Sequence, residues 1–277
     1  MAWPECNNIV ALRQLFGAPG RGQSVTETDA AAVVATRHPA YPSVAILRID
    51  RMRKKNALRP VDIEALGQHL ARLQVDPEVS LIIITGSGDA FCAGADINIL
   101  NALSGDALAS FIEMQVDFLS RVVMAPKIVV AAVNGASSGF GNHLIACCDL
   151  CVIEESAVLH FTGAAKGLPS LLMGTLVMPM TIGLKRAKSL YLRGGKLSAQ
   201  QAVDDGLANY SVPAVQWDSE LDKLAAEFSG RSNATMAHNK FQLNQGVFQM
   251  LGAAKLSGLA GAATLSPRDS IPAGRLA

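Results

Sequence analysis

Two glycine-rich turns hold the residues of this sequence that could do chemistry. Residues 86–96 (GSGDAFCAGAD) follow the apolar run 81–85, and residues 134–141 (NGASSGFG) follow the apolar run 128–133. Their small side chains let a ligand lie against main-chain N–H groups. A helix beginning near Gly141 would add the positive end of its dipole. We interpret the second turn, which the first mirrors, as an oxyanion hole that stabilises negative charge on an acyl group.

The second turn is open to two other interpretations. Its GASSG sequence at 135–139 matches the G-x-S-x-G elbow of hydrolases, for which His160 and His238 are the bases available in the sequence. Neither histidine lies in a distinctive loop. A dinucleotide-binding turn fits less well, because both glycine pairs lack a third glycine and no acidic residue ends a following strand at the expected distance.

Strands and helices must position these turns, and their pattern predicts an α/β fold with a helical C-terminal part. The predicted strands are 43–49, 81–85, 128–133, 150–153 and 157–161. The predicted helices are 60–73, one from about 141, 171–182, 198–205 and most of 214–251, and residues 97 to about 123 are predicted to be mostly helical. Pro60 and Ser198 suit the starts of their helices. We expect an N-terminal, partly ordered extension at 1–42, a core at 43–213, and a helical region with a tail at 214–277.

The composition argues against a nucleic-acid-binding protein and against a membrane protein. The chain has 277 residues, half of them hydrophobic, and a formal net charge of +1, which provides no general attraction for nucleic acid. No apolar run reaches the ~18 residues needed to cross a bilayer, and the N-terminus does not resemble a signal peptide. We expect no membrane partner and a cytoplasmic location. Cys148 and Cys151 have the spacing of half a zinc site, but no second half follows.

A cationic turn precedes the helix that starts at Pro60. Arg53, Lys54 and Lys55 crowd it together with Arg51. A solvated loop is one interpretation. The other is a site for a phosphorylated handle, because Arg and Lys are the usual partners of phosphate.

The pairing of the two glycine turns resembles the enoyl-CoA hydratase/isomerase (crotonase) superfamily. The resemblance runs from about residue 44 to 212 and does not cover the first 40 residues or the tail. Its most specific segments are RKKNAL at 53–58, ITGSGDAFCAGADI at 84–97, PKIVVAAVNGASSGFGNHLIACCD at 126–149 and LRGGKLSAQQAVDDGLANYSVP at 192–213.

The resemblance implies a crotonase-like spiral of repeated ββα units that acts on acyl thioesters. The thioester would be carried by coenzyme A or by the phosphopantetheine of an acyl carrier protein, with no tightly bound cofactor and no metal. A homotrimer or a dimer of trimers is also implied. The oxyanion donors would be the N–H groups of Ala95 and Phe140. The positions expected to bind the ligand are Arg53, Lys54, Lys55, Ala57, Ala93 and Asp96. Asp96 also stands where the following helix needs an N-cap.

The acids of the family are missing. The two glutamates of family hydratases correspond to His143 and Gly163, and the glutamate of many isomerases falls close to Leu171. Glycine and leucine cannot transfer a proton, so simple hydration is disfavoured. His143 is the leading acid/base, because an imidazole titrates near neutral pH, although a packing role is the alternative. The other polar residues nearby are Ser137, Ser138, Asn142, His160, Thr162, Lys166 and Ser170.

The sequence therefore predicts an enzyme that stabilises a thioester enolate. Double-bond isomerisation or a related reaction such as decarboxylation needs at most one proton donor, and we favour it. The alternatives are hydration with a non-standard acid/base, thioester hydrolysis, and an inactive binding subunit that keeps the fold.

Overall fold

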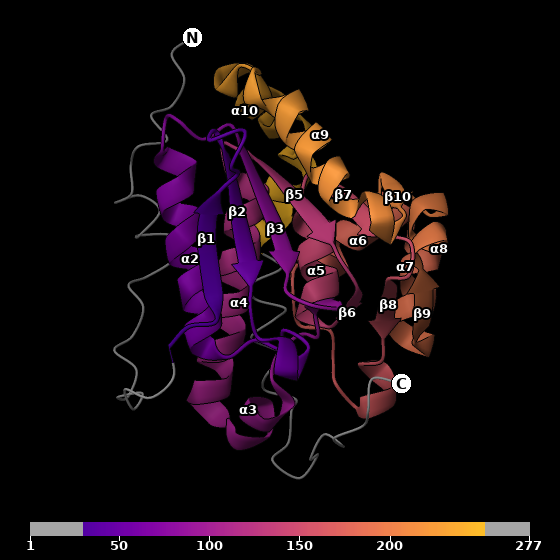
Figure 1. Ribbon diagram of the computed structural model, residues 1–277. Coiled ribbons are helices and arrows are strands. Elements are labelled where there is room, and N and C mark those ends of the chain that lie inside the picture. Colours follow the sequence, from indigo (N-terminus) through magenta and orange to yellow (C-terminus); the bar gives the residue numbers. More distant parts are fainter. Residues whose placement is uncertain (1–29, 253–277) are drawn as a thin grey trace. The chain divides into compact units, whose positions relative to one another are not determined.

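The structure is a computed structural model that describes residues 30–252 (Figure 1). Residues 31–252 lie in the larger of two compact units of the chain. The first 29 residues of the predicted extension and the predicted tail beyond residue 252 lie outside the described residues. Among residues 30–252, no helix is long and apolar enough to cross a membrane.

A six-stranded sheet forms the centre of the larger unit. From left to right in Figure 1 the strands are β1, β2, β3, β5, β7 and β10, and only β1 is antiparallel to its neighbour. Their bounds are Val33–Arg37, Val44–Ile49, Leu81–Gly86, Ile128–Val133, Leu150–Glu154 and Tyr210–Val212. Within the predicted N-terminal extension, residues 33–37 form strand β1 and pair with β2, although they lack a strand-like apolar pattern.

Both faces of this sheet are covered, which explains why β3 and β5 are unbroken apolar runs. One face packs on α2 (Pro60–Val75), α4 (Gly105–Met124) and α5 (Phe140–Cys147). The other face packs on α9 (Trp217–Ser229) through the alternate residues of the same strands. The apolar runs on which the predicted strands rest are therefore buried core.

A second, four-stranded sheet carries the glycine turns. Its strands, in spatial order, are β4 (Ala90–Cys92), β6 (Ala136–Ser138), β8 (Val158–Phe161) and β9 (Gly195–Ser198). Three strands of the first sheet each lead into a strand of the second: β3 into β4, β5 into β6, and β7 into β8. A helix follows each pair. This repetition confirms the predicted ββα spiral. Short strands β4, β6 and β9 escaped the sequence prediction because three or four residues carry no clear period.

The remaining helices connect these layers. They are α3 (Ile97–Ala102), α6 (Gly174–Ile182), α7 (Leu184–Lys188), α8 (Ala199–Asp204) and α10 (Asn233–Leu243), with a π-helical turn at Ser189–Arg193. Residues 97–123 are mostly helical, as predicted, but they form two helices, because the chain is extended at Leu103 and Gly105 takes a positive φ of 52°. Ser198 caps α8 as predicted, accepting a hydrogen bond from Gln201 N.

The cysteines behave as small hydrophobic residues. Cys92, Cys147 and Cys151 are buried, and burial raises the pKa of each thiol to about 12. Thiols with such pKa values are not thiolates at neutral pH, so these side chains fill the core rather than act as nucleophiles.

Candidate active site

The two glycine turns lie directly against each other. Strands β4 and β6 are parallel neighbours, so the turns that follow them meet at the same edge of the second sheet. A Cβ atom on Gly94 would lie 3.0 Å from Ser138 O and 3.2 Å from Phe140 N. Gly94 and Gly139 also have positive φ values of 93° and 53°. Only glycine permits both this backbone and this approach.

The contact brings two main-chain donors to one place. Ala95 is fixed because its neighbours bond to a loop residue: Leu58 N donates to Gly94 O at 2.8 Å, and Asp96 N donates to Leu58 O at 2.9 Å. Phe140 is the first residue of α5, where N–H groups have no acceptor within the helix. Among residues 30–252, neither the Ala95 N–H nor the Phe140 N–H donates a hydrogen bond.

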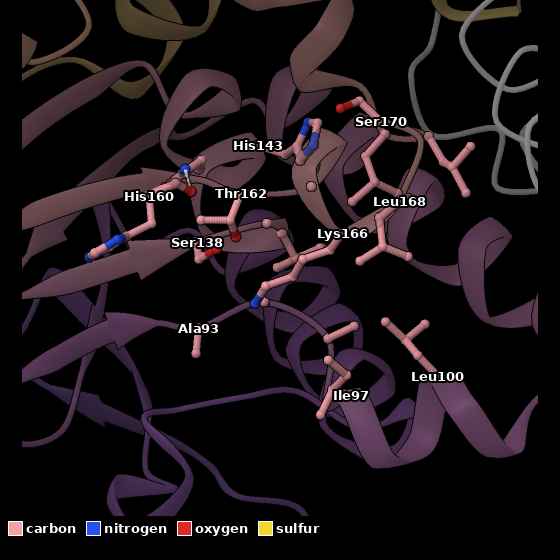
Figure 2. Close-up of a pocket in the computed structure, with 18 of the residues that line it drawn as sticks. Ala93, Ile97, Leu100, Ser138, His143, His160, Thr162, Lys166, Leu168 and Ser170 are labelled. Carbon is pink, nitrogen blue, oxygen red and sulfur yellow. Dashed lines mark hydrogen bonds between the residues drawn. The ribbon is translucent and has the colours of Figure 1, made fainter. Parts of the chain in front are cut away.

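Ala95 and Phe140 line a cavity of about 350 Å³ (Figure 2). Its wall is mainly apolar, including Ile97, Leu100, Ile112, Leu168, Leu172 and Leu190. Among the described residues that line it, Asp96 is the only acid. Two fixed donors in a largely apolar cavity are suited to an oxygen that gains negative charge during a reaction.

Asp96 is committed to structure rather than free for chemistry. Its Oδ1 accepts a hydrogen bond from Asn98 N at 3.0 Å and so caps α3, while Arg51 Nη1 lies 2.6 Å from its Oδ2. Burial opposes ionisation of the carboxyl, but the Arg51 and Asn98 hydrogen bonds and the charges of Arg51 and Lys54 outweigh it and lower the pKa. The N-cap interpretation is confirmed.

All three positions that correspond to the missing family acids reach this cavity. His143, in the first turn of α5, lines it together with Gly163 and Leu171. Gly163 and Leu171, two of these three residues, cannot carry a proton. His143 is the only side chain at these positions that can.

The environment of His143 corrects the expectation of a titration near neutral pH. The side chain is 5% exposed, and burial lowers its pKa from 6.5 to about 4. Its Nδ1 is buried without a hydrogen-bond partner among the described residues, and it lies 2.3 Å from where a Cβ on Gly174 would be. The Tyr191 ring lies 5.8 Å away, centroid to centroid. The imidazole is therefore neutral at neutral pH.

The other polar candidates divide into two groups. Those that line the cavity are Ser138, Asn142, His160, Thr162, Lys166 and Ser170. Ser137 does not line it: this side chain is 1% exposed, and its Oγ packs against Gly141 without a partner among the described residues. A nucleophile in a hydrolase elbow must be exposed to substrate, so this position of Ser137 speaks against that interpretation.

The cationic turn contributes one of its three predicted residues to the cavity. Lys54 lines it, as do Ala57 and Ala93. Lys55 Nζ instead lies 2.5 Å from Asp89 Oδ2, and Arg53 is exposed and outside the cavity wall.

A buried asparagine holds this turn in place. Asn56, which has a positive φ of 57°, donates through Nδ2 to Ser87 O and Ala90 O and accepts through Oδ1 from Arg51 N. The left-handed backbone that asparagine tolerates thus fixes the turn against the strand β4 that leads to Gly94.

Comparison with known proteins agrees with this arrangement. A family model described as enoyl-CoA hydratase/isomerase matches residues 40–257. The chain belongs to the enoyl-CoA hydratase/isomerase family. It is 27% identical over 205 residues to YngF of Bacillus subtilis (strain 168), provisionally named an enoyl-CoA hydratase/isomerase, a match covering 74% of this chain and 79% of that protein.

Two solved structures of this family show the same fold. One is an enoyl-CoA hydratase/isomerase from Mycobacterium paratuberculosis, with 28% identity, a TM-score of 0.75, and coverage of 86% of this chain and 95% of that chain. The other is an enoyl-CoA hydratase from Bacillus anthracis, with 26% identity, a TM-score of 0.74, and coverage of 85% and 92%. The family assignment supports an enzyme, whose particular reaction depends on the side chains in the cavity.

The structure shows three contacts of the site that sequence reasoning missed. Arg51 neutralises Asp96, Gly174 makes room for His143, and Tyr191 packs on its ring. Each meets its partner across at least 30 residues of chain, so no local pattern could have paired them. The π-helical turn that holds Tyr191 also lacks a recognised sequence signal.

Proposed function

We propose that this enzyme binds an acyl thioester of coenzyme A and stabilises its enolate with the N–H groups of Ala95 and Phe140. The observation that carries the proposal is the contact between the Gly94 and Gly139 turns, which brings to one cavity two donors that make no hydrogen bond among residues 30–252. One such donor contributes roughly 3 kcal/mol to stabilising an oxyanion.

The reaction that fits this cavity needs no carboxylate pair. Hydration requires an activated water and a proton for the α-carbon, and Asp96 is held by Arg51. Double-bond isomerisation moves one proton, and decarboxylation of a β-carboxyl thioester forms the enolate without a base. We place isomerisation first and decarboxylation beside it as the related enolate reaction.

His143 is the proton carrier in this proposal. Its pKa of about 4 is close to that of a glutamate carboxyl, about 4.3 in model peptides. A neutral imidazole of this basicity accepts a proton about as readily as the carboxylate it replaces. The lowered pKa therefore keeps His143 deprotonated and ready to act as a base at neutral pH.

A His143→Ala variant tests this role. We expect the rate to fall by about two to four orders of magnitude while the affinity for the thioester remains, because the oxyanion donors are main-chain groups. A His143→Gln variant, which keeps a polar side chain of similar size, should be equally slow. Full activity in either folded variant would remove His143 from the mechanism.

The family resemblance also supports a homotrimer or a dimer of trimers. Sedimentation equilibrium of the full chain would distinguish these assemblies from a monomer. The carrier of the acyl group can be tested by comparing coenzyme A thioesters with the same acyl groups on an acyl carrier protein, since we propose that Lys54 interacts with the coenzyme A phosphates.

A further inference from the structure

A strip of polar side chains runs along one wall of the cavity. Ser138 ends β6, Thr162 directly follows β8, and Lys166 ends the 3₁₀ turn Ala164–Lys166. Because Ser138 pairs with His160 across β6 and β8, the two hydroxyl residues lie at the ends of adjacent strands. Among residues 30–252, neither hydroxyl makes a hydrogen bond and Lys166 makes no ion pair.

Figure 2 shows how the strip lies in the cavity. The Ser138 and Thr162 side chains are on the same side as His160, and the Lys166 side chain points towards the side formed by Ala93. Leu168, Leu100 and Ile97 form the opposite, apolar side. The cavity therefore has one polar wall and one apolar wall.

The charges of the cavity do not cancel. Lys54 and Lys166 both line it, whereas the one acid that lines it, Asp96, already forms an ion pair with Arg51. A cation and two hydroxyl donors against a low-dielectric wall attract an anion.

We propose that Lys166, Ser138 and Thr162 form a subsite for a carboxylate on the acyl group, so that the substrate is the thioester of a dicarboxylic acid. This inference rests on the proposed function, which places the thioester carbonyl at Ala95 and Phe140. Ser138 is only two residues before Phe140, so the anion lies close to that carbonyl. A carboxylate on the α-carbon, as in a malonyl-type thioester, fits this short separation.

The phosphates of coenzyme A are a second source of negative charge. They are separated from the thioester by the whole pantetheine arm, whereas Ser138 adjoins the oxyanion turn. Pantetheine thioesters, which lack these phosphates, distinguish the two sources.

The test uses two pantetheine thioesters of matched size. Sulfoacetyl-pantetheine carries a fixed negative charge, and methylsulfonylacetyl-pantetheine is neutral; neither can lose carbon dioxide. Dissociation constants are measured by calorimetry for the full-length chain, for Lys166→Met, and for Lys196→Met. Lys196 is the matched control, because it faces His160 from β9 and does not line the cavity.

We expect the unaltered protein and Lys196→Met to bind the sulfonate about 10- to 100-fold more tightly than the sulfone. This is the range that hydrogen bonds to a charged group typically contribute. Lys166→Met should lose most of this preference while its affinity for the sulfone stays the same. A Ser138→Ala/Thr162→Ala variant should lose part of it.

Equal affinities of the unaltered protein for the two probes would overturn the inference, as would an unchanged preference in Lys166→Met. So would an effect of Lys166→Met that appears only with coenzyme A thioesters, since the subsite would then serve phosphate. If no thioester of any kind binds, the proposed function itself is wrong.

Discussion

Burial of His143 makes the stability of the protein depend on pH in a specific way. The pKa of the folded imidazole is about 4 against 6.5 for an ordinary histidine. Between these values the unfolded chain binds a proton that the folded protein does not. The free energy of unfolding therefore has its full value above pH 6.5 and decreases as the pH falls through 4.

The size of this effect follows from the two pKa values. The difference between 6.5 and about 4, at about 1.4 kcal/mol per pH unit, corresponds to about 3 kcal/mol. This is a large share of the 5–15 kcal/mol that is roughly typical of a folded domain. Most of the change should fall between pH 6 and pH 4.

Urea unfolding at a series of pH values measures this contribution. His143→Gln removes the titrating group, so its free energy of unfolding should vary with pH by about 3 kcal/mol less than that of the unaltered protein. His160→Gln is the matched comparison: burial, Lys196 and Lys166 also lower the pKa of His160, so this variant should reduce the pH dependence in the same direction. Parallel curves for the unaltered protein and His143→Gln would refute the argument that burial keeps this imidazole neutral.

Three further predictions concern the cavity. Ala95→Pro removes one oxyanion donor and should lower kcat by about 100- to 1000-fold, whereas Ala95→Ser keeps the N–H and should not lower it. Equal kcat values for these two variants would exclude this donor. Lys54→Ala should raise KM for a coenzyme A thioester with little change in kcat. Lys55→Ala should leave KM unchanged, because Lys55 pairs with Asp89. Identical KM values for the two variants would contradict a role of Lys54 alone in binding the thioester. Gly174→Ala places a Cβ 2.3 Å from the His143 Nδ1, so it should lower the free energy of unfolding by about 1–3 kcal/mol, which thermal unfolding would measure. An unchanged Tm would show that the His143 ring can move away at no cost.

Much of the fold could be predicted because the core strands are apolar runs of strand length. Residues 81–85 and 128–133 are buried on both faces. Short, unbroken apolar runs of this kind are typical of strands in a parallel sheet that is covered on both sides. The helix boundary at Gly105 could not be predicted, because the apolar period continues across the break. Strand β1 was missed since its residues alternate poorly and pair only with β2.

The oxyanion turns could be located from the sequence because a run of glycine, alanine and serine predicts a turn whose main-chain N–H groups are accessible to a ligand. The contact between Gly94 and Gly139 depends on the pairing of β4 with β6, which sequence alone does not fix. The pKa of His143 was predicted wrongly, since burial is a property of the neighbours that pack around the ring and not of the residue type. Lys166 was visible as a polar residue, but only the cavity shows that it has no acidic partner among the lining residues.

Exchange of the α-hydrogen tests the proposed enolate chemistry most directly. Enoyl, β-keto and malonyl-type thioesters would be incubated with the protein in deuterated water, and deuterium at the α-carbon measured by mass spectrometry. The account predicts exchange or deuterium incorporation with at least one thioester, and a loss of about 100-fold or more in folded Ala95→Pro. No α-deuterium from thioesters that demonstrably bind, or undiminished exchange in Ala95→Pro, would contradict it.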